Sequence, residues 1–128
     1  LFNEKNNGSS ILELINKKLV ISCHDISVGG LLINLAEMSI EGNIGVKIDM
    51  PKTLINPIEY FFSEDQSRYI VEIENVNLDN VTKILNKNSV FFENIGKTQK
   101  EKLTLDKEFE INIEDMKEIN NRWFKKYI

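Results

Sequence analysis

The alternation of helix-like and strand-like hydrophobic patterns constrains the fold of this 128-residue chain more than any other feature. In some segments apolar residues recur every three or four positions, which is typical of an amphipathic helix. In others they recur at every second position, which is typical of a half-buried strand. The two kinds of segment alternate along most of the chain, and strand-like segments then follow one another. This order predicts an α+β domain in which a layered, mixed β-sheet is covered by helices.

The individual elements follow from the same patterns. Strands are predicted at residues 19–22, 45–50, 68–73, 90–95, 103–105 and 109–113. Helices are predicted after a capping box formed by Ser10 and Glu13, and at residues 31–40, 57–62 and 78–85. A C-terminal helix is predicted to dock on the sheet through a stripe of Met116, Ile119, Trp123 and Tyr127. Residues 24–30 are predicted to be a loop and residues 96–102 a turn.

The N-terminal residues set the expected domain boundary. Residues 1–8 are polar and are predicted to be a linker or a frayed segment, so that residues 9–128 form a single domain. The chain starts at Leu1 rather than at a methionine, which suggests an excised fragment.

Charge and composition exclude several classes of protein. The net charge is −4, with acidic and basic residues mixed along the chain, which disfavours binding to nucleic acid. No apolar run is long enough to cross a membrane, and no secretory signal opens the chain. Cys23 is the single cysteine, so no internal disulfide can form, which fits a cytoplasmic location. A lone cysteine of this kind is predicted to be a small buried hydrophobe.

The polar stretch at residues 22–30 is the first candidate site. A predicted strand ends there, and Gly29 and Gly30 open a helix whose first backbone N–H groups lack partners within the helix. Such a helix start favours anions, and glycine lets a phosphate approach closely. Ser27 could cap the helix or donate to phosphate, Asp25 could accept from a ribose or help hold a metal, and His24 could donate or carry a proton. The alternative is that these side chains bond only to one another and to the turn.

A second polar stretch at residues 63–69 lies between an aromatic pair and an apolar strand. Glu64 and Asp65 could bind hydrated Mg²⁺, and Gln66 could contact a sugar or an amide. The alternative is a solvated loop in which one of the two carboxylates pairs with Arg68.

A nucleophilic cysteine activated by a histidine was also considered for Cys23 and His24. This pair is disfavoured because neighbouring residues on a strand point to opposite faces.

Together the two stretches resemble the C-terminal domain of the AIR synthetase-like ATP-binding superfamily, and within it the phosphoribosylformylglycinamidine synthase family. The resemblance rests on His-Asp-x-Ser followed by Gly-Gly, on Glu-Asp-Gln-x-Arg-Tyr and on Ile-Gly-x-Thr, found here at residues 24–30, 64–69 and 95–98. An Ala-Glu-Met phrase at residues 36–38 and Trp123 near the end extend it over nearly the whole chain. Val28 departs from the pattern, because the family has an acidic residue there.

The resemblance implies part of an ATP-dependent ligase with an AIR synthetase C-terminal-domain-like fold. In that family ATP activates the amide oxygen of formylglycinamide ribonucleotide, and ammonia from glutamine displaces it to give the amidine of de novo purine biosynthesis. ATP and Mg²⁺ are then expected to bind mainly outside this chain, which is expected to hold no catalytic residue. The implied partners are the preceding domains of the same enzyme, a glutaminase domain or subunit, and a small phosphorylated substrate.

The resemblance also assigns roles to the two candidate stretches. The residues expected toward phosphate or nucleotide are His24, Asp25, Ser27, Gly29 and Gly30, and those expected at a loop contact are Glu64, Asp65, Gln66 and Arg68. Whether any of them binds a metal stays open. Two alternatives also remain. One is the C-terminal domain of another superfamily member, such as AIR synthetase or selenophosphate synthetase, and the other is a non-catalytic structural or interaction domain.

Overall fold

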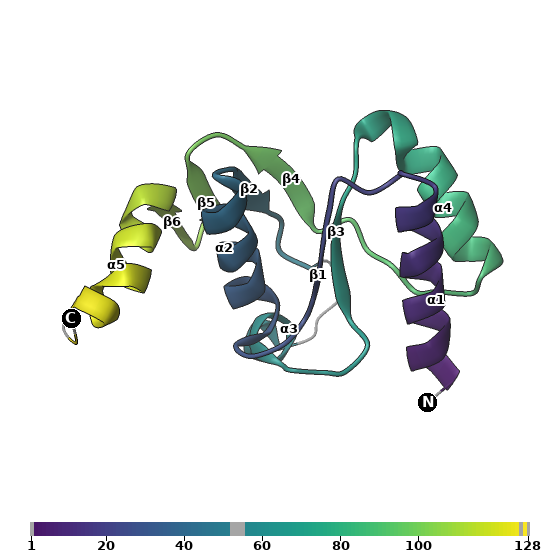
Figure 1. Ribbon diagram of the computed structural model, residues 1–128, viewed down its shortest axis with the longest axis horizontal. Helices are drawn as coiled ribbons and strands as arrows, with labels where there is room; N and C mark the ends of the chain where they lie inside the picture. Colours follow the sequence, from purple (N-terminus) through teal and green to yellow (C-terminus); the bar gives the residue numbers. More distant parts are fainter. Residues whose placement is uncertain (1, 52–55, 126, 128) are drawn as a thin grey trace.

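The computed structural model describes residues 2–51, 56–125 and 127, and within them the strands form two sheets (Figure 1). The smaller sheet pairs β1 (Ser22–Asp25) antiparallel with β3 (Tyr69–Glu72). The larger sheet has the order β4-β2-β5-β6 and consists of β2 (Gly45–Ile48), β4 (Gly96–Gln99), β5 (Lys102–Leu105) and β6 (Phe109–Asn112). Because β2 is parallel to β5 but antiparallel to β4, the larger sheet is mixed. The predicted α+β class with a mixed sheet is therefore confirmed.

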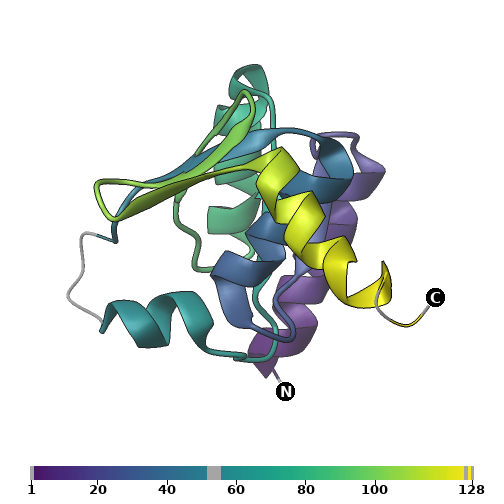
Figure 2. The same cartoon turned by 90° about the vertical axis from the view of Figure 1, so that its left-hand side faces the viewer.

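The helices lie in two groups. α2 (Gly30–Gly42) and α5 (Ile113–Lys125) pack against each other beside the four-stranded sheet, as Figure 2 shows, and α3 (Pro57–Phe62) packs on α2. At the other end of the molecule α1 (Phe2–Asn16) lies next to α4 (Leu78–Lys87), which follows a short 3-10 turn, η1 (Asn75–Asn77).

Each group of helices has its own apolar core. The larger core lies between α2, α3, α5 and the strands, and includes Leu31, Leu35, Ile48, Phe61, Leu103 and Met116. The smaller core joins α1 to α4 and consists of Leu14, Val81 and Leu85, with Leu19, Val20 and Ile73 packed around it. Leu14, Ile48 and Leu103 are almost completely buried, so these three side chains mark the centres of the two cores.

The first helix corrects the predicted N-terminus. It begins at Phe2 rather than after Ser10, and residues 2–8, predicted to be frayed, are helical. Ser10 is buried within the helix, where its hydroxyl accepts a hydrogen bond from the Asn88 side chain rather than capping the helix. The Asn7 side chain donates to the carbonyl of Ser67. These polar side chains therefore bond to distant parts of the chain, which a local pattern cannot reveal.

The first strand is also displaced from its prediction. It covers Ser22–Asp25, so His24 and Asp25 belong to a strand instead of a loop, whereas Leu19 and Val20 pack against the α1–α4 core. The apolar residues 19–21 were predicted to be buried, but Leu19 and Val20 are only half-buried, Ile21 is exposed, and the ladder to β3 starts at Ser22.

The fourth strand corrects a second boundary. β4 covers Gly96–Gln99, within the predicted turn, and residues 90–95, predicted to be a strand, precede it outside any strand. Among these described residues, the carbonyl of Ile95 alone continues the contact with β2, by accepting from the Asp49 amide. Gly96 lies so close to β2 that an added Cβ would be 2.0 Å from the carbonyl oxygen of Lys47. The strand thus starts where glycine permits this approach, and the chain reverses at Glu101, which has φ 61°.

The C-terminal helix is present as predicted, but the apolar residues predicted to dock it on the sheet are only partly buried. Met116 is buried in the larger core, whereas Ile119 and Tyr127 are exposed. The side chain of Trp123 lies outside the described part of the structure. Among the described residues, no helix combines the length and apolar character that a membrane crossing requires.

We predict that Ile48→Ala destabilises the domain by about 2–5 kcal/mol, because it leaves a cavity in the central strand of the larger sheet. Ile48 is 0% exposed, whereas Ile58 on α3 is 69% exposed and provides the matched control. Ile58→Ala should change the free energy of unfolding by no more than about 0.5 kcal/mol. Urea unfolding measures both variants, and equal losses of stability would contradict the placement of the core.

Candidate functional site

The glycine loop between β1 and α2 is shaped by close packing. Gly29 and Gly30 have φ angles of 84° and 73°, a left-handed conformation that suits glycine. An added Cβ on Gly30 would lie 2.6 Å from backbone atoms of Phe62 at the end of α3. Gly30 is therefore explained by the contact between α2 and α3, without any ligand.

A buried asparagine holds the same loop from the inside. Asn34 of α2 is 0% exposed, and its side-chain oxygen accepts a hydrogen bond of 2.7 Å from the backbone N–H of Ser27. Its side-chain nitrogen donates to the carbonyl of Val28 and to the carboxylate of Glu37. Sequence reasoning missed Asn34. The available signal was a polar residue on the apolar face of the predicted helix.

Glu64 holds the loop from the outside and brings the two candidate stretches together. The backbone N–H of Gly29 donates to the Glu64 carboxylate at 2.8 Å. The N–H of Gly30 donates to the carbonyl of Ser27, so the amides of Ser27, Gly29 and Gly30 all have partners within the protein. Ser27 itself is exposed and does not cap α2, whose N-cap residue is Gly29 without a side-chain cap. Of the two roles considered for Ser27, capping the helix is contradicted, because Asn34 and Glu64 make the side-chain contacts to this loop.

Arg68 organises the second polar stretch. Its guanidinium donates to the Ser63 hydroxyl at 3.0 Å and to the Tyr60 carbonyl at 3.3 Å, and lies 3.7 Å from the carboxylate of Asp65. The Asp65 carboxylate also accepts from the Ser63 hydroxyl. Gln66 is exposed at the turn before β3. The predicted pairing of an acidic residue with Arg68 is therefore present, through Asp65.

Tyr60 connects this network to the segment before β4. The Arg68 guanidinium lies 5.8 Å from the centre of the Tyr60 ring, and the Tyr60 hydroxyl donates to Glu93 at 3.1 Å. Burial, followed by the hydrogen bond to Glu93, raises the pKa of Tyr60 to about 12. Tyr60 is thus a stable hydrogen-bond donor at neutral pH and cannot serve as a general base there.

His24 and Asp25 lie on β1, apart from the Glu64 contact. One ring nitrogen of His24 is 3.9 Å from Glu37, and the other contacts the carbonyl of Asp25. Cys23 is exposed, which corrects the predicted buried thiol. Within the part of the chain that the structure describes, its strand pairs with β3 alone. Partial desolvation and then the charge of Asp25 raise the pKa of the Cys23 thiol, which disfavours a nucleophilic thiolate.

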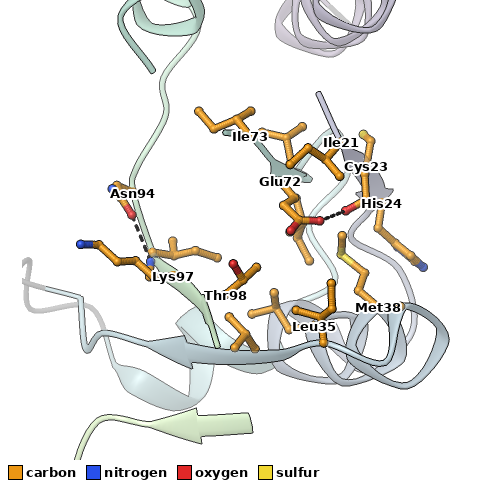
Figure 3. A pocket seen from close by; sticks show the side chains of 18 of the residues that line it. Ile21, Cys23, His24, Leu35, Met38, Glu72, Ile73, Asn94, Lys97 and Thr98 are labelled. Carbon is orange, nitrogen blue, oxygen red and sulfur yellow. Dashed lines mark hydrogen bonds between the residues drawn. The ribbon is translucent and has the colours of Figure 1, made fainter. Parts of the chain in front are cut away.

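A groove of about 950 Å³ runs between the two sheets (Figure 3). Its walls include Leu35 and Met38 of α2, with Lys97 and Thr98 of β4 opposite the β1–β3 sheet. Of the predicted site residues, only His24 lines it. Its acidic lining residues outnumber the basic Lys97 and are Glu37, Glu41, Glu72, Glu74 and Glu93. This charge disfavours a phosphorylated ligand in the groove.

The described residues do not fit a protein-held metal ion. No group of three or more histidine, cysteine, aspartate or glutamate side chains comes together in them to hold one. Glu64 and Asp65, considered above as possible ligands of hydrated Mg²⁺, contact the Gly29 amide and the Ser63–Arg68 pair.

Comparisons with known proteins agree on one family and one fold. The sequence model of the family described as AIR synthase related protein, C-terminal domain, matches residues 2–107. The chain is 44% identical over its 128 residues to the phosphoribosylformylglycinamidine synthase subunit PurL of Pelagibacter ubique, of which it spans 18%. The structures of T. maritima PurL complexed with FGAR and with ATP match 88% of the chain at TM-scores of 0.75 and 0.74. The chain covers 20% and 21% of those chains at 21% and 20% identity, so these matches show the fold.

We predict that Gly30→Ala destabilises the domain by about 1–3 kcal/mol, because the new methyl group meets the Phe62 backbone in a left-handed conformation. Gly42 lies at the other end of α2, where an added Cβ would meet no neighbouring side chain or other segment within 4 Å, and serves as the control. Gly42→Ala should be neutral or stabilising by up to about 1 kcal/mol. Denaturant midpoints measure the difference, and a Gly30→Ala protein as stable as Gly42→Ala would contradict the packing argument.

Proposed function

Because this chain belongs to the family of AIR synthase related proteins, as their C-terminal domain, we propose that it is part of a phosphoribosylformylglycinamidine synthase. The whole enzyme would use ATP and glutamine to convert formylglycinamide ribonucleotide to its amidine. The observation that carries this proposal is the 44% identity to a PurL subunit over the complete chain. The same similarity favours this enzyme over AIR synthetase or selenophosphate synthetase.

The activity is proposed for the whole enzyme, because the chain spans about a fifth of the relatives it matches. We propose that ATP and Mg²⁺ bind mainly in the other domains, which also hold the catalytic residues. The preceding domains of the same enzyme and a glutaminase domain or subunit are its proposed partners. The similar T. maritima protein is described in complexes with ATP and with FGAR, which supports both proposed ligands. A cytoplasmic location is proposed with the biosynthetic role.

A contact with the phosphorylated substrate is the proposed role of the first stretch, whose candidates are His24, Asp25, Ser27, Gly29 and Gly30. For a phosphate to bind the Gly29 amide, it would have to replace Glu64, since that amide already donates to the Glu64 carboxylate. Asp65, Gln66 and Arg68 remain the other proposed loop contacts. Arg68 is half-buried and committed to Ser63 and Tyr60, so its proposed role is to hold the loop.

A second candidate function is that of a structural domain that completes the enzyme without contacting a ligand. The internal partners of the Ser27, Gly29 and Gly30 amides favour it, because they satisfy the groups that an anion would otherwise bind. Soaking or co-crystallising the full-length protein with formylglycinamide ribonucleotide separates the two candidates. Density for the substrate phosphate at residues 27–30 supports contact, and a bound substrate elsewhere supports the structural role.

We predict that the full-length protein, given ATP, Mg²⁺, formylglycinamide ribonucleotide and ammonia, forms the amidine and releases phosphate, whereas the 128-residue chain alone does neither. The reason is that the chain spans about a fifth of the relatives it matches, so it lacks most of the proposed enzyme. Phosphate release with and without the ribonucleotide measures the coupled reaction. A full-length protein without amidine formation would refute the proposed function. Turnover by the 128-residue chain alone would refute the proposal that the catalytic residues lie in the other domains.

A further inference from the structure

We infer that Glu64 is a positioning residue, whose carboxylate fixes the glycine loop before α2 to the polar loop after α3. Glu64 lies 35 residues from Gly29 in sequence, yet its carboxylate accepts the Gly29 amide at 2.8 Å. The contact joins the two polar stretches singled out from the sequence, and neither stretch by itself indicates it.

The local chemistry explains why a carboxylate from elsewhere is needed. The first amides of a helix lack partners within it, and the helix dipole gives them partial positive charge. The residues that precede α2 provide no side-chain cap, because Ser27 makes none and Val28 is apolar and 78% exposed. Glu64 therefore supplies the negative oxygen that the neighbouring sequence does not.

Two further contacts tie the same loops together on either side of Gly29. The N–H of Ile26 donates to the carbonyl of Arg68 at 2.8 Å, and Gly30 packs directly on the backbone of Phe62. Asn34 holds Ser27 and Val28 from the protein interior. The Glu64 carboxylate thus lies at the solvent side of this loop, whose other contacts are made by Ile26, Gly30 and Asn34. Loss of the carboxylate leaves the Gly29 amide without its acceptor, while those other contacts remain.

Hydrogen–deuterium exchange on the full-length protein tests this inference, followed in a peptide that covers residues 26–31. Glu64→Ala should speed exchange of the Gly29 amide about tenfold, because a net stabilising hydrogen bond is lost. Glu64→Gln should fall between Glu64→Ala and the wild type, since its amide oxygen still accepts. Glu59→Ala, an exposed glutamate on α3, is the matched control and should leave exchange unchanged. Residues 102–105 of β5 should exchange at the wild-type rate in every variant, which excludes global destabilisation.

A wild-type exchange rate in Glu64→Ala, or an equal increase in Glu59→Ala, overturns the inference. A kinetic measurement extends it and rests on the proposed function: since the substrate phosphate would have to displace Glu64 from the Gly29 amide, Glu64→Ala should lower the KM for formylglycinamide ribonucleotide more than it changes kcat. Unchanged kinetics alongside faster exchange would overturn the link between this positioning and the substrate. A wild-type protein without amidine activity refutes the proposed function alone, because the exchange result does not depend on turnover.

Discussion

The backbone of Phe62 lies so close to Gly30 that one added carbon atom would be 2.6 Å away from it. This approach sets the distance between α3 and α2, and with it the position of the polar loop that follows α3. Glu64 then reaches the Gly29 amide, and Arg68 brings its own carbonyl to Ile26 and its guanidinium to Ser63. The arrangement of both candidate stretches thus depends on a residue without a side chain.

Local periodicity predicted the elements whose packing follows their own sequence. α2, α3, α4, β2 and β5 lie close to where the apolar patterns indicated, because one face of each is buried. The predicted element boundaries are wrong where contacts with residues distant in sequence determine the local structure. Ser10 and Asn7 bond to Asn88 and Ser67 across the fold, so a polar segment forms a helix instead of fraying. Gly96 begins β4 because β2 approaches it closely, which no property of residues 90–102 alone could indicate.

The candidate site was predictable as a pair of segments but not as a set of contacts. The sequence pointed to both polar stretches, and the pairing of Asp65 with Arg68 was among the stated alternatives. The Glu64–Gly29 bond was not predictable, because it depends on how α3 meets α2. Asn34 was hidden by the apolar residues around it, although a buried amide in a helix needs partners for its oxygen and its nitrogen. His24 was grouped with the glycines by sequence proximity, yet it lies on β1 and lines the groove.

The division of the apolar core has a consequence for how the molecule opens. α1 and α4 are held to each other chiefly by Leu14, Val81 and Leu85, a far smaller cluster than the one beneath the four-stranded sheet. Protection against local opening scales with the apolar contacts that an opening event must break. The α1–α4 pair is therefore the weaker cooperative unit. A thermal fluctuation that peels it away breaks the hydrogen bond from Asn7 to Ser67 but leaves the close contact between Gly30 and Phe62 in place.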